Sequence, residues 1–199
     1  DIIYHSASSV NFIEPYSYMK QPNVEGLREI IHFASLKKTK CLVLLSTISV
    51  YSWGHIFTGK TVMKEDDDIA QNLLSVSKDI GYDRSKWVME AIADLAQKQG
   101  LPLITYRLGY AMCHSKSGAS AAYQWWSGLV KNCFEFNSYP ALDELREGLI
   151  TVDYMTRAIS HISTNPAAIG KKFNLIARPE TNLTLIEFFK LLNAYYNLD

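Results

Sequence analysis

A tyrosine and a lysine stand four residues apart in the stretch GYDRSKW, as Tyr82 and Lys86. On a helix, two residues at this spacing lie on one face, with their Cβ atoms about 5–6 Å apart. A lysine ammonium at such a distance can stabilise a tyrosinate, which lowers a phenol pKa whose usual value is about 10. The pair therefore has two interpretations: a catalytic acid with its helper, or an amphipathic tyrosine beside a solvated lysine.

The spacing alone does not separate these interpretations, because 12 tyrosines and 14 lysines in 199 residues make such a pair expected by chance. A second pair does occur, at Tyr16 and Lys20. The first pair differs because the apolar run 41–46 predicts a buried strand and Thr47 follows it. Ligands of parallel sheets bind beyond the carboxyl ends of the strands, where the Thr47 hydroxyl could meet the phenol of Tyr82. Tyr16 and Lys20 precede that strand, and we interpret them as the chance pair.

Apolar runs alternate with helical periodicity along the first half of the chain. The predicted strands are 2–4, 41–46 and 101–107, and the predicted helices are 23–38 and a helix from about 82 to the stop at Gly100 and Pro102. This order is typical of parallel βαβ units in a doubly wound α/β fold. The later residues predict a loop at 114–118, a helix near 123–126, a short strand and a helix within 150–162, a strand at 171–176 and a closing helix at 183–196.

The composition predicts one globular domain with a sizeable core, since 48% of the residues are hydrophobic. The 20 basic and 20 acidic residues cancel, so the net charge gives no indication of binding to nucleic acid or to an anionic membrane. No stretch approaches the roughly 20 apolar residues that a membrane span needs. The three cysteines are widely spaced and the histidines form no ligand pair, so we expect no metal site and a reducing cytoplasm.

Five segments resemble the thioester reductase domains of nonribosomal peptide and polyketide synthetases and of carboxylic acid reductases, which belong to the extended short-chain dehydrogenase/reductase superfamily. The segments are DIIYHSASSVN (1–11), NVEG (23–26), STISVY (46–51), GYDRSKWVME (81–90) and YRLGYAMCHSKSG (106–118). The fourth is the most specific match, to G-Y-x-x-S-K-W-x-x-E. The sequence departs from the family pattern at Leu27, Leu108, Ala111 and Cys113. Three of these lie in the loop that lines the nicotinamide and the substrate in the family, so the acyl substrate stays open.

The family begins with a strand, a glycine-rich turn for the pyrophosphate and two more strands, all before the first segment matched here. None of the ten glycines forms such a turn. The resemblance therefore implies a partial Rossmann-like doubly wound parallel sheet, with the second half of the core at about 1–110 and mainly a substrate-binding region at about 111–199. It also implies that the missing N-terminal part is a partner. We expect this chain alone to be inactive and to bind a dinucleotide poorly.

The resemblance further implies NADPH-dependent reduction of an acyl thioester on a phosphopantetheinylated carrier protein, giving an aldehyde or, after a second hydride transfer, an alcohol. NADH is not excluded. Thr47 and Tyr82 would bind the developing oxyanion, Tyr82 would donate the proton, and Lys86 would bind the ribose and hold the phenol pKa down. The expected cofactor-binding residues are Ser6, Ala7, Ser8, Asn23, Tyr82, Lys86, Leu108 and Gly109.

Two alternatives stay open. One is another extended reductase, such as a nucleotide-sugar epimerase or dehydratase. The other is a non-catalytic relative that senses a dinucleotide, although such relatives usually lose the tyrosine or the lysine, and both are present here.

Overall fold

The computed structural model describes residues 1–121, 123–146 and 148–196. The chain forms two compact units, of which the first contains Asp1–Leu108 and Ile159–Asn174 and the second contains the remaining described residues. One boundary between the units falls after Leu108, and the stretch Ile159–Asn174 belongs to the first unit. The predicted division near residue 110 into a Rossmann-like core and a substrate-binding region stays a prediction.

A four-stranded parallel sheet forms the centre of the fold. Its strands are β1 (Ile2–His5), β2 (Cys41–Thr47), β3 (Leu103–Leu108) and β4 (Lys172–Leu175), and they lie in this order across the sheet. In the register, His5 is opposite Leu44 and Thr47 is opposite Leu108, so β2 and β3 end together. The predicted fold class, a Rossmann-like parallel α/β sheet, is confirmed.

The chain between β1 and β2 is helical over a longer stretch than predicted. The short helix α1 (Tyr16–Met19) continues through a π-helical turn at Lys20–Glu25 into α2 (Gly26–Ser35). The prediction began this helix at residue 23, directly after Pro22, a residue type that has no amide hydrogen to donate and whose ring clashes with the preceding helical turn. The wider π-helical turn accommodates the proline, so the helix starts before it.

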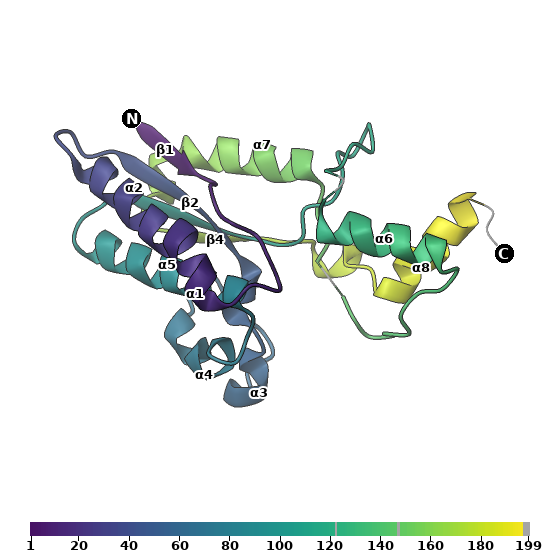
Figure 1. Ribbon diagram of the computed structural model, residues 1–199. Coiled ribbons are helices and arrows are strands. Elements are labelled where there is room, and N and C mark those ends of the chain that lie inside the picture. The colour runs from purple at the N-terminus through teal and green to yellow at the C-terminus, as the bar shows by residue number, and fades with distance from the viewer. Residues whose placement is uncertain (122, 147, 197–199) are drawn as a thin grey trace. The chain divides into compact units, whose positions relative to one another are not determined.

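Helices cover both faces of the sheet in the first unit. Figure 1 shows α2 and α5 (Gly81–Lys98) side by side on one face. Their apolar residues and those of β1 to β3 form a buried cluster that includes Leu27, Leu42, Leu44, Met89 and Leu103. On the other face, the hydroxyl of Tyr106 lies 3.0 Å from the Ser163 hydroxyl at the end of α7 (Val152–Ser163). Neighbouring residues of β3 thus point to opposite helices, as the pleat of a strand requires.

The polar segment between β2 and α5 contains short helical pieces that the sequence did not indicate. They are a 3₁₀ turn at Ile48–Tyr51, α3 (Gly54–Thr58), a 3₁₀ turn at Ile69–Asn72 and α4 (Leu73–Val76). Val50, Tyr51 and Ile69 form a small buried cluster against Trp87 of α5. The indole nitrogen of Trp87 donates to the Ile69 oxygen at 3.0 Å. These contacts fix the segment against the helix that carries Tyr82 and Lys86.

The second unit has its own apolar cluster. Trp126 of α6 (Trp125–Glu135) packs with Leu185 and Phe189 of α8 (Leu185–Tyr196). Trp126 is buried and Trp125 is half exposed, as expected for adjacent residues that point about 100° apart on a helix.

The short strand expected near residue 150 is a single bridge between Ala111 and Ile150. Within the described residues, no helix combines the length and the hydropathy that crossing a membrane requires.

Candidate active site

Lys86 lies in the second turn of α5 and reaches the carboxyl end of β2. Only 4% of the residue is exposed. Its Nζ donates a hydrogen bond of 2.8 Å to the backbone oxygen of Leu45, two residues before Thr47. Burial lowers the pKa of Lys86 to about 8, and the charge of Glu90 opposes that shift. Lys86 is therefore mainly a cation at neutral pH, held at the strand end where the sequence predicted Thr47 to act.

Tyr82 is the second residue of α5, and the glycine before it sets the position of the helix. A Cβ atom on Gly81 would lie between 2.3 and 2.6 Å from backbone atoms of residues 14–16. Only glycine allows the start of α5 to come this close to the start of α1. The ring of Tyr82 is half-buried and meets the Phe12 ring edge-on, with 5.5 Å between the centroids. Gly81 thus allows α5, the helix that contains Tyr82, to pack closely against α1.

Asn23 ties the loop after β1 to α5. Its amide nitrogen donates to the Ser9 oxygen at 3.1 Å and to the Ser85 hydroxyl at 2.9 Å, and its oxygen accepts from the Ser9 amide at 2.7 Å. Asn23 is fully buried. These bonds give Asn23 a positioning role, because they use both amide hydrogens inside the protein. Its predicted contact with a cofactor stays a prediction.

Thr47 ends β2 and caps the 3₁₀ turn that follows. Its hydroxyl accepts from the Ser49 amide and donates to the Ser49 hydroxyl, both at 3.2 Å. Helix α5 packs against both β2 and this turn. The structure therefore brings Thr47 and Lys86 to the same end of β2. Tyr82 lies one turn before Lys86 on α5.

The loop after β1 contains polar groups suited to a ligand. His5 Nε2 and Ser8 Oγ are buried and have no hydrogen-bond partner among the described residues. Burial, and then the charge of Lys86, lower the pKa of His5. Ser6 and Ala7 are exposed between them. A nicotinamide nucleotide, with its ribose hydroxyls and carboxamide, offers partners for such atoms, so the residues present fit this group.

Leu108 is the last residue of β3, and Gly109 follows it. Leu108 is opposite Thr47 in the register. A Cβ atom on Gly109 would meet the Gly148 oxygen at 2.9 Å, and its amide donates to the Leu175 oxygen at 2.8 Å. Gly109 is therefore required by close packing in the second unit, and its amide hydrogen is already used there. The predicted contacts of both residues with a nicotinamide stay predictions.

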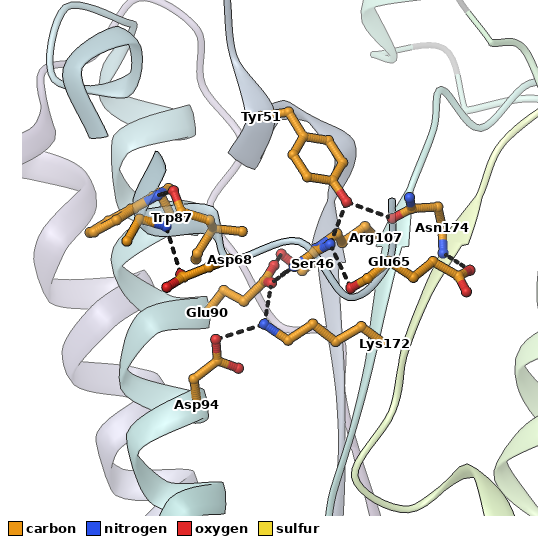
Figure 2. A network of polar contacts seen from close by, with 12 residues as sticks. Ser46, Tyr51, Glu65, Asp68, Trp87, Glu90, Asp94, Arg107, Lys172 and Asn174 are labelled. Carbon is orange, nitrogen blue, oxygen red and sulfur yellow. Dashed lines mark hydrogen bonds and ion pairs between the residues drawn. The ribbon is translucent and has the colours of Figure 1, made fainter. Parts of the chain in front are cut away.

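A buried ionic network lies along α5 beneath this edge, and the sequence analysis assigned it no role. Figure 2 shows Glu90 in its centre. The Arg107 guanidinium of β3 donates twice to Glu90 Oε1, and the Ser46 hydroxyl donates to Oε2 at 3.0 Å. Lys172 Nζ bridges Glu90 at 3.1 Å and Asp94 at 2.6 Å. Two carboxylates thus face two cations.

Burial by itself would raise the pKa of Glu90, but Arg107 and Lys172 outweigh burial and hold the pKa below its usual value. Arg107 also donates to the Tyr51 hydroxyl, which in turn donates to Asn174 at 3.2 Å. The network joins β2, β3, β4 and α5 at one level of the sheet. One signal could have revealed it: Arg107 is the single charge in an apolar strand, and such a charge needs a buried partner.

The described residues contain no group of three His, Cys, Asp or Glu side chains that could hold a metal ion.

A family model described as male sterility protein, from an NAD-binding family, matches residues 1–159. The nonribosomal peptide synthetase asaC of Aspergillus flavus is 31% identical over 186 residues, which cover 94% of this chain and 18% of asaC. The aldehyde reductase lnaA of the same species is 31% identical over 185 residues, which cover 92% of this chain and 18% of lnaA. The solved terminal R domain of the myxalamid PKS–NRPS pathway has a TM-score of 0.87 and 32% identity.

The match to that solved structure covers 98% of this chain and 47% of the solved R domain. The chain thus spans about a fifth of the curated relatives and about half of the solved R domain. The predicted resemblance to the reductase domains of peptide and polyketide synthetases is confirmed by these likenesses.

Proposed function

The chain belongs to the NAD-binding family described as male sterility protein, and from this premise we propose that it is part of a reductase that releases a carrier-bound acyl thioester as an aldehyde. One observation carries the proposal. The ammonium of Lys86 is buried, bonded to the Leu45 oxygen and lodged at the strand end that also presents Thr47. A solvated lysine, the alternative interpretation, would not be placed there.

The acid–base roles that we propose for three side chains are those implied by the resemblance to thioester reductases. When bound, the reduced nicotinamide supplies the hydride that the thioester carbonyl carbon accepts. Negative charge then develops on the carbonyl oxygen, and the hydroxyls of Thr47 and Tyr82 donate hydrogen bonds to it. Tyr82 gives up its proton to that oxygen, and the Lys86 ammonium stabilises the tyrosinate left behind. The resulting hemithioacetal collapses to a thiol and an aldehyde.

The cofactor would lie along the loop after β1. The buried His5 Nε2 and Ser8 Oγ, which have no hydrogen-bond partner among the described residues, support this placement. We propose NADPH as the reductant because the resemblance to thioester reductases implies it. A second round of the same proton donation, acting on the aldehyde, would give the alcohol.

Two partners belong to the proposal. The first is a phosphopantetheinylated carrier protein, whose thioester is the substrate; the likeness to a peptide synthetase supports it. The second is the rest of the reductase, including the glycine-rich turn that this sequence lacks. Within the described residues β1 pairs only with β2, and we propose that a strand of the rest of the reductase pairs with its other side. The isolated chain is then expected to bind NADPH weakly, and tight binding would contradict this part.

The test uses the complete polypeptide that carries this chain. An acyl-pantetheine thioester and NADPH should give the aldehyde, identified by mass spectrometry, with matching consumption of NADPH. Thr47→Val removes one hydroxyl and keeps the side-chain shape, so the kcat should fall by roughly 10²–10³-fold while the NADPH Kd stays unchanged. Thr39→Val, at an exposed loop position, is the control and should leave the kcat unchanged. Thioester cleavage to the acid without NADPH consumption would contradict the proposal.

A further inference from the structure

Two aromatic rings of the second unit stack on each other just beyond the end of β3. The ring centroids of Tyr110 and Trp125 are 5.7 Å apart, with 30° between the ring planes. Trp125 is the first residue of α6, and 44% of it is exposed. Exposed tryptophan and tyrosine rings are typical of surfaces that bind another molecule, because much apolar area stays in contact with water until a ligand covers it. We call these two residues the aromatic platform.

The neighbours of both platform residues hold them in place. The backbone oxygen of Tyr110 accepts a hydrogen bond of 3.0 Å from the Ile150 amide. Trp126, which follows Trp125, is buried and meets the Phe188 ring edge-on, with 5.1 Å between the centroids. One tryptophan thus anchors the start of α6 in the apolar cluster, and the other contributes to the platform. Since the rings are already ordered, a ligand that stacks on them costs the protein little conformational entropy.

The platform begins close to the strand end at which the proposed reduction takes place. Leu108 ends β3 opposite Thr47, and Tyr110 follows Leu108 by two residues. Two residues of chain span at most about 7 Å, so the covalent chain itself keeps the backbone of Tyr110 near Leu108. The acyl group of a thioester extends from the reacting carbonyl carbon, and a chain of a few carbon atoms covers such a distance.

The chemistry of the two rings selects among acyl groups. An aromatic ring has a negative face and a positive edge, so a second ring is attracted to it in a stacked or edge-on geometry, whereas a carboxylate is repelled by the face. Among the described residues, the cluster around Trp126 contains apolar side chains and the Cys133 thiol. It therefore offers neither an acyl carboxylate nor an acyl ammonium a group of opposite charge. An aromatic acyl group fits these surroundings best.

We propose that Tyr110 and Trp125 form the subsite that binds the acyl group, and that the substrate carries an aromatic acyl group. The inference rests on the proposed function, because the acyl group is that of the thioester to be reduced. The rings lie against a part of the substrate that does not react, so they stabilise the bound substrate and the transition state alike. The platform should therefore affect the KM more than the kcat.

The first test measures kcat and KM of the complete polypeptide with several acyl-pantetheine thioesters at saturating NADPH. Phenylpropanoyl carries a ring, hexanoyl is an apolar chain, and aminohexanoyl and adipoyl end in an ammonium and a carboxylate. The kcat/KM for phenylpropanoyl should exceed that for hexanoyl by about 3- to 10-fold, because ring stacking adds to the burial of apolar area. Both charged thioesters should be poorer substrates than hexanoyl. A preference for either charged group would overturn the proposed substrate class.

The second test removes one ring of the platform. Trp125→Leu keeps an apolar side chain but should lower the kcat/KM for phenylpropanoyl by about 3- to 10-fold, mainly through a higher KM. The kcat/KM for hexanoyl should stay within about twofold of the wild type. Trp125→Phe restores a ring and should recover most of the preference for phenylpropanoyl.

Phe134 on the same helix provides the matched control. It is 41% exposed and meets the Tyr196 ring edge-on, and it lies about 180° around α6 from Trp125. Phe134→Leu should leave the preference for phenylpropanoyl unchanged. If Trp125→Leu and Phe134→Leu have equal effects, the platform is not the acyl subsite.

A binding measurement without NADPH separates this proposal from the proposed function. Isothermal titration calorimetry of the complete polypeptide should show that the Kd of the phenylpropanoyl thioester rises by about 3- to 10-fold in Trp125→Leu. If the Kd rises in this way but no thioester is reduced when NADPH is added, the subsite stands and the proposed function is wrong. If thioesters are reduced but neither the Kd nor the kcat/KM depends on Trp125, the proposed function stands and the subsite is wrong.

Discussion

Two tyrosine–lysine pairs with the same spacing have opposite surroundings in this protein. Lys20 projects into solvent, with 55% of its side chain exposed, and lies 3.7 Å from the Glu25 carboxylate. Lys86 is buried and bonds the strand backbone. Tyr16 holds the guanidinium of Arg84 over its ring, whereas Tyr82 sits in the first turn of α5 at the end of β2.

The difference lies in what each helix packs against. Tyr16 packs against the apolar cluster of the first unit, whereas Lys20 lies on the exposed side of its helix. The second pair begins a helix that is fixed by Gly81, by the bond between Ser85 and Asn23, and by Trp87. A spacing that occurs by chance gains chemical meaning when tertiary contacts remove the lysine from water. Most of the predictions below therefore compare a change at a buried or closely packed position with the same type of change at an exposed or open one.

The largest expected effect is that of removing the buried ammonium. Lys86→Met should lower the kcat of thioester reduction by at least about 100-fold, because the tyrosinate of Tyr82 loses its stabilising charge. Lys20→Met should leave the kcat unchanged. Steady-state kinetics of both variants in the complete polypeptide check this, and equal rates would mean that burial does not mark the functional lysine.

The same substitution should not destabilise the fold. The pKa of Lys86 is about 8 in the folded protein, against about 10.4 for an unfolded lysine. The charged form therefore costs folding free energy below pH 8, on the order of 3 kcal/mol, and this cost disappears as the pH rises past the unfolded value. Lys86→Met avoids the cost but removes the hydrogen bond that the ammonium donates to the Leu45 oxygen, at about 1–3 kcal/mol. Thermal unfolding at pH 7 should show an unchanged or higher Tm.

The second effect concerns stability. Arg107→Met should lower the free energy of unfolding by about 3–5 kcal/mol, because it leaves the buried Glu90 carboxylate without its main partner. Arg28→Met, which breaks an exposed ion pair with Glu25, should change it by less than about 0.5 kcal/mol. Urea denaturation measures both.

The stability loss caused by Arg107→Met should also depend on pH. Without Arg107, burial should raise the pKa of Glu90, and the carboxyl becomes neutral as the pH falls. The loss of stability should therefore be largest at neutral pH and smaller in acid. A loss that is constant from pH 7 to pH 4 would contradict an unpaired charge as the cause.

The smallest expected effects are the stability changes caused by replacing two glycines, Gly81 and Gly26, with alanine. Gly81→Ala places a Cβ atom against backbone atoms of residues 14–16, so we expect a loss of about 1–3 kcal/mol and a lower kcat as α5 shifts. A Cβ atom on Gly26 meets nothing within 4 Å. Gly26→Ala should stabilise its helix by up to about 1 kcal/mol, and a destabilised Gly26→Ala would mean that the contrast is not steric.

The sequence predicted the elements whose signal is local. The apolar runs of β2 and β3 and the periodicity of α5 placed the sheet and the helix with Tyr82 within a few residues. The start of the helix before α2 was missed because a proline normally ends or begins a helix, and the π-helical turn around Pro22 depends on packing that a local pattern does not show.

The site was predicted in part for the same reason. The predicted topology was enough to place Thr47 and Lys86 near the same strand end. It did not predict the hydrogen bonds that each of them makes. The network of Glu90, Arg107 and Lys172 joins residues far apart along the chain, and only the fold brings them together.

The most direct test of the account compares Tyr82→Phe with Tyr16→Phe in the complete polypeptide, with an acyl-pantetheine thioester and NADPH. Each substitution removes one phenol oxygen and keeps the ring. We predict that Tyr82→Phe lowers the kcat by about 10²–10⁴-fold with NADPH binding intact, while Tyr16→Phe leaves it unchanged. Equal kcat values for the two variants would show that the chemistry does not lie in GYDRSKW.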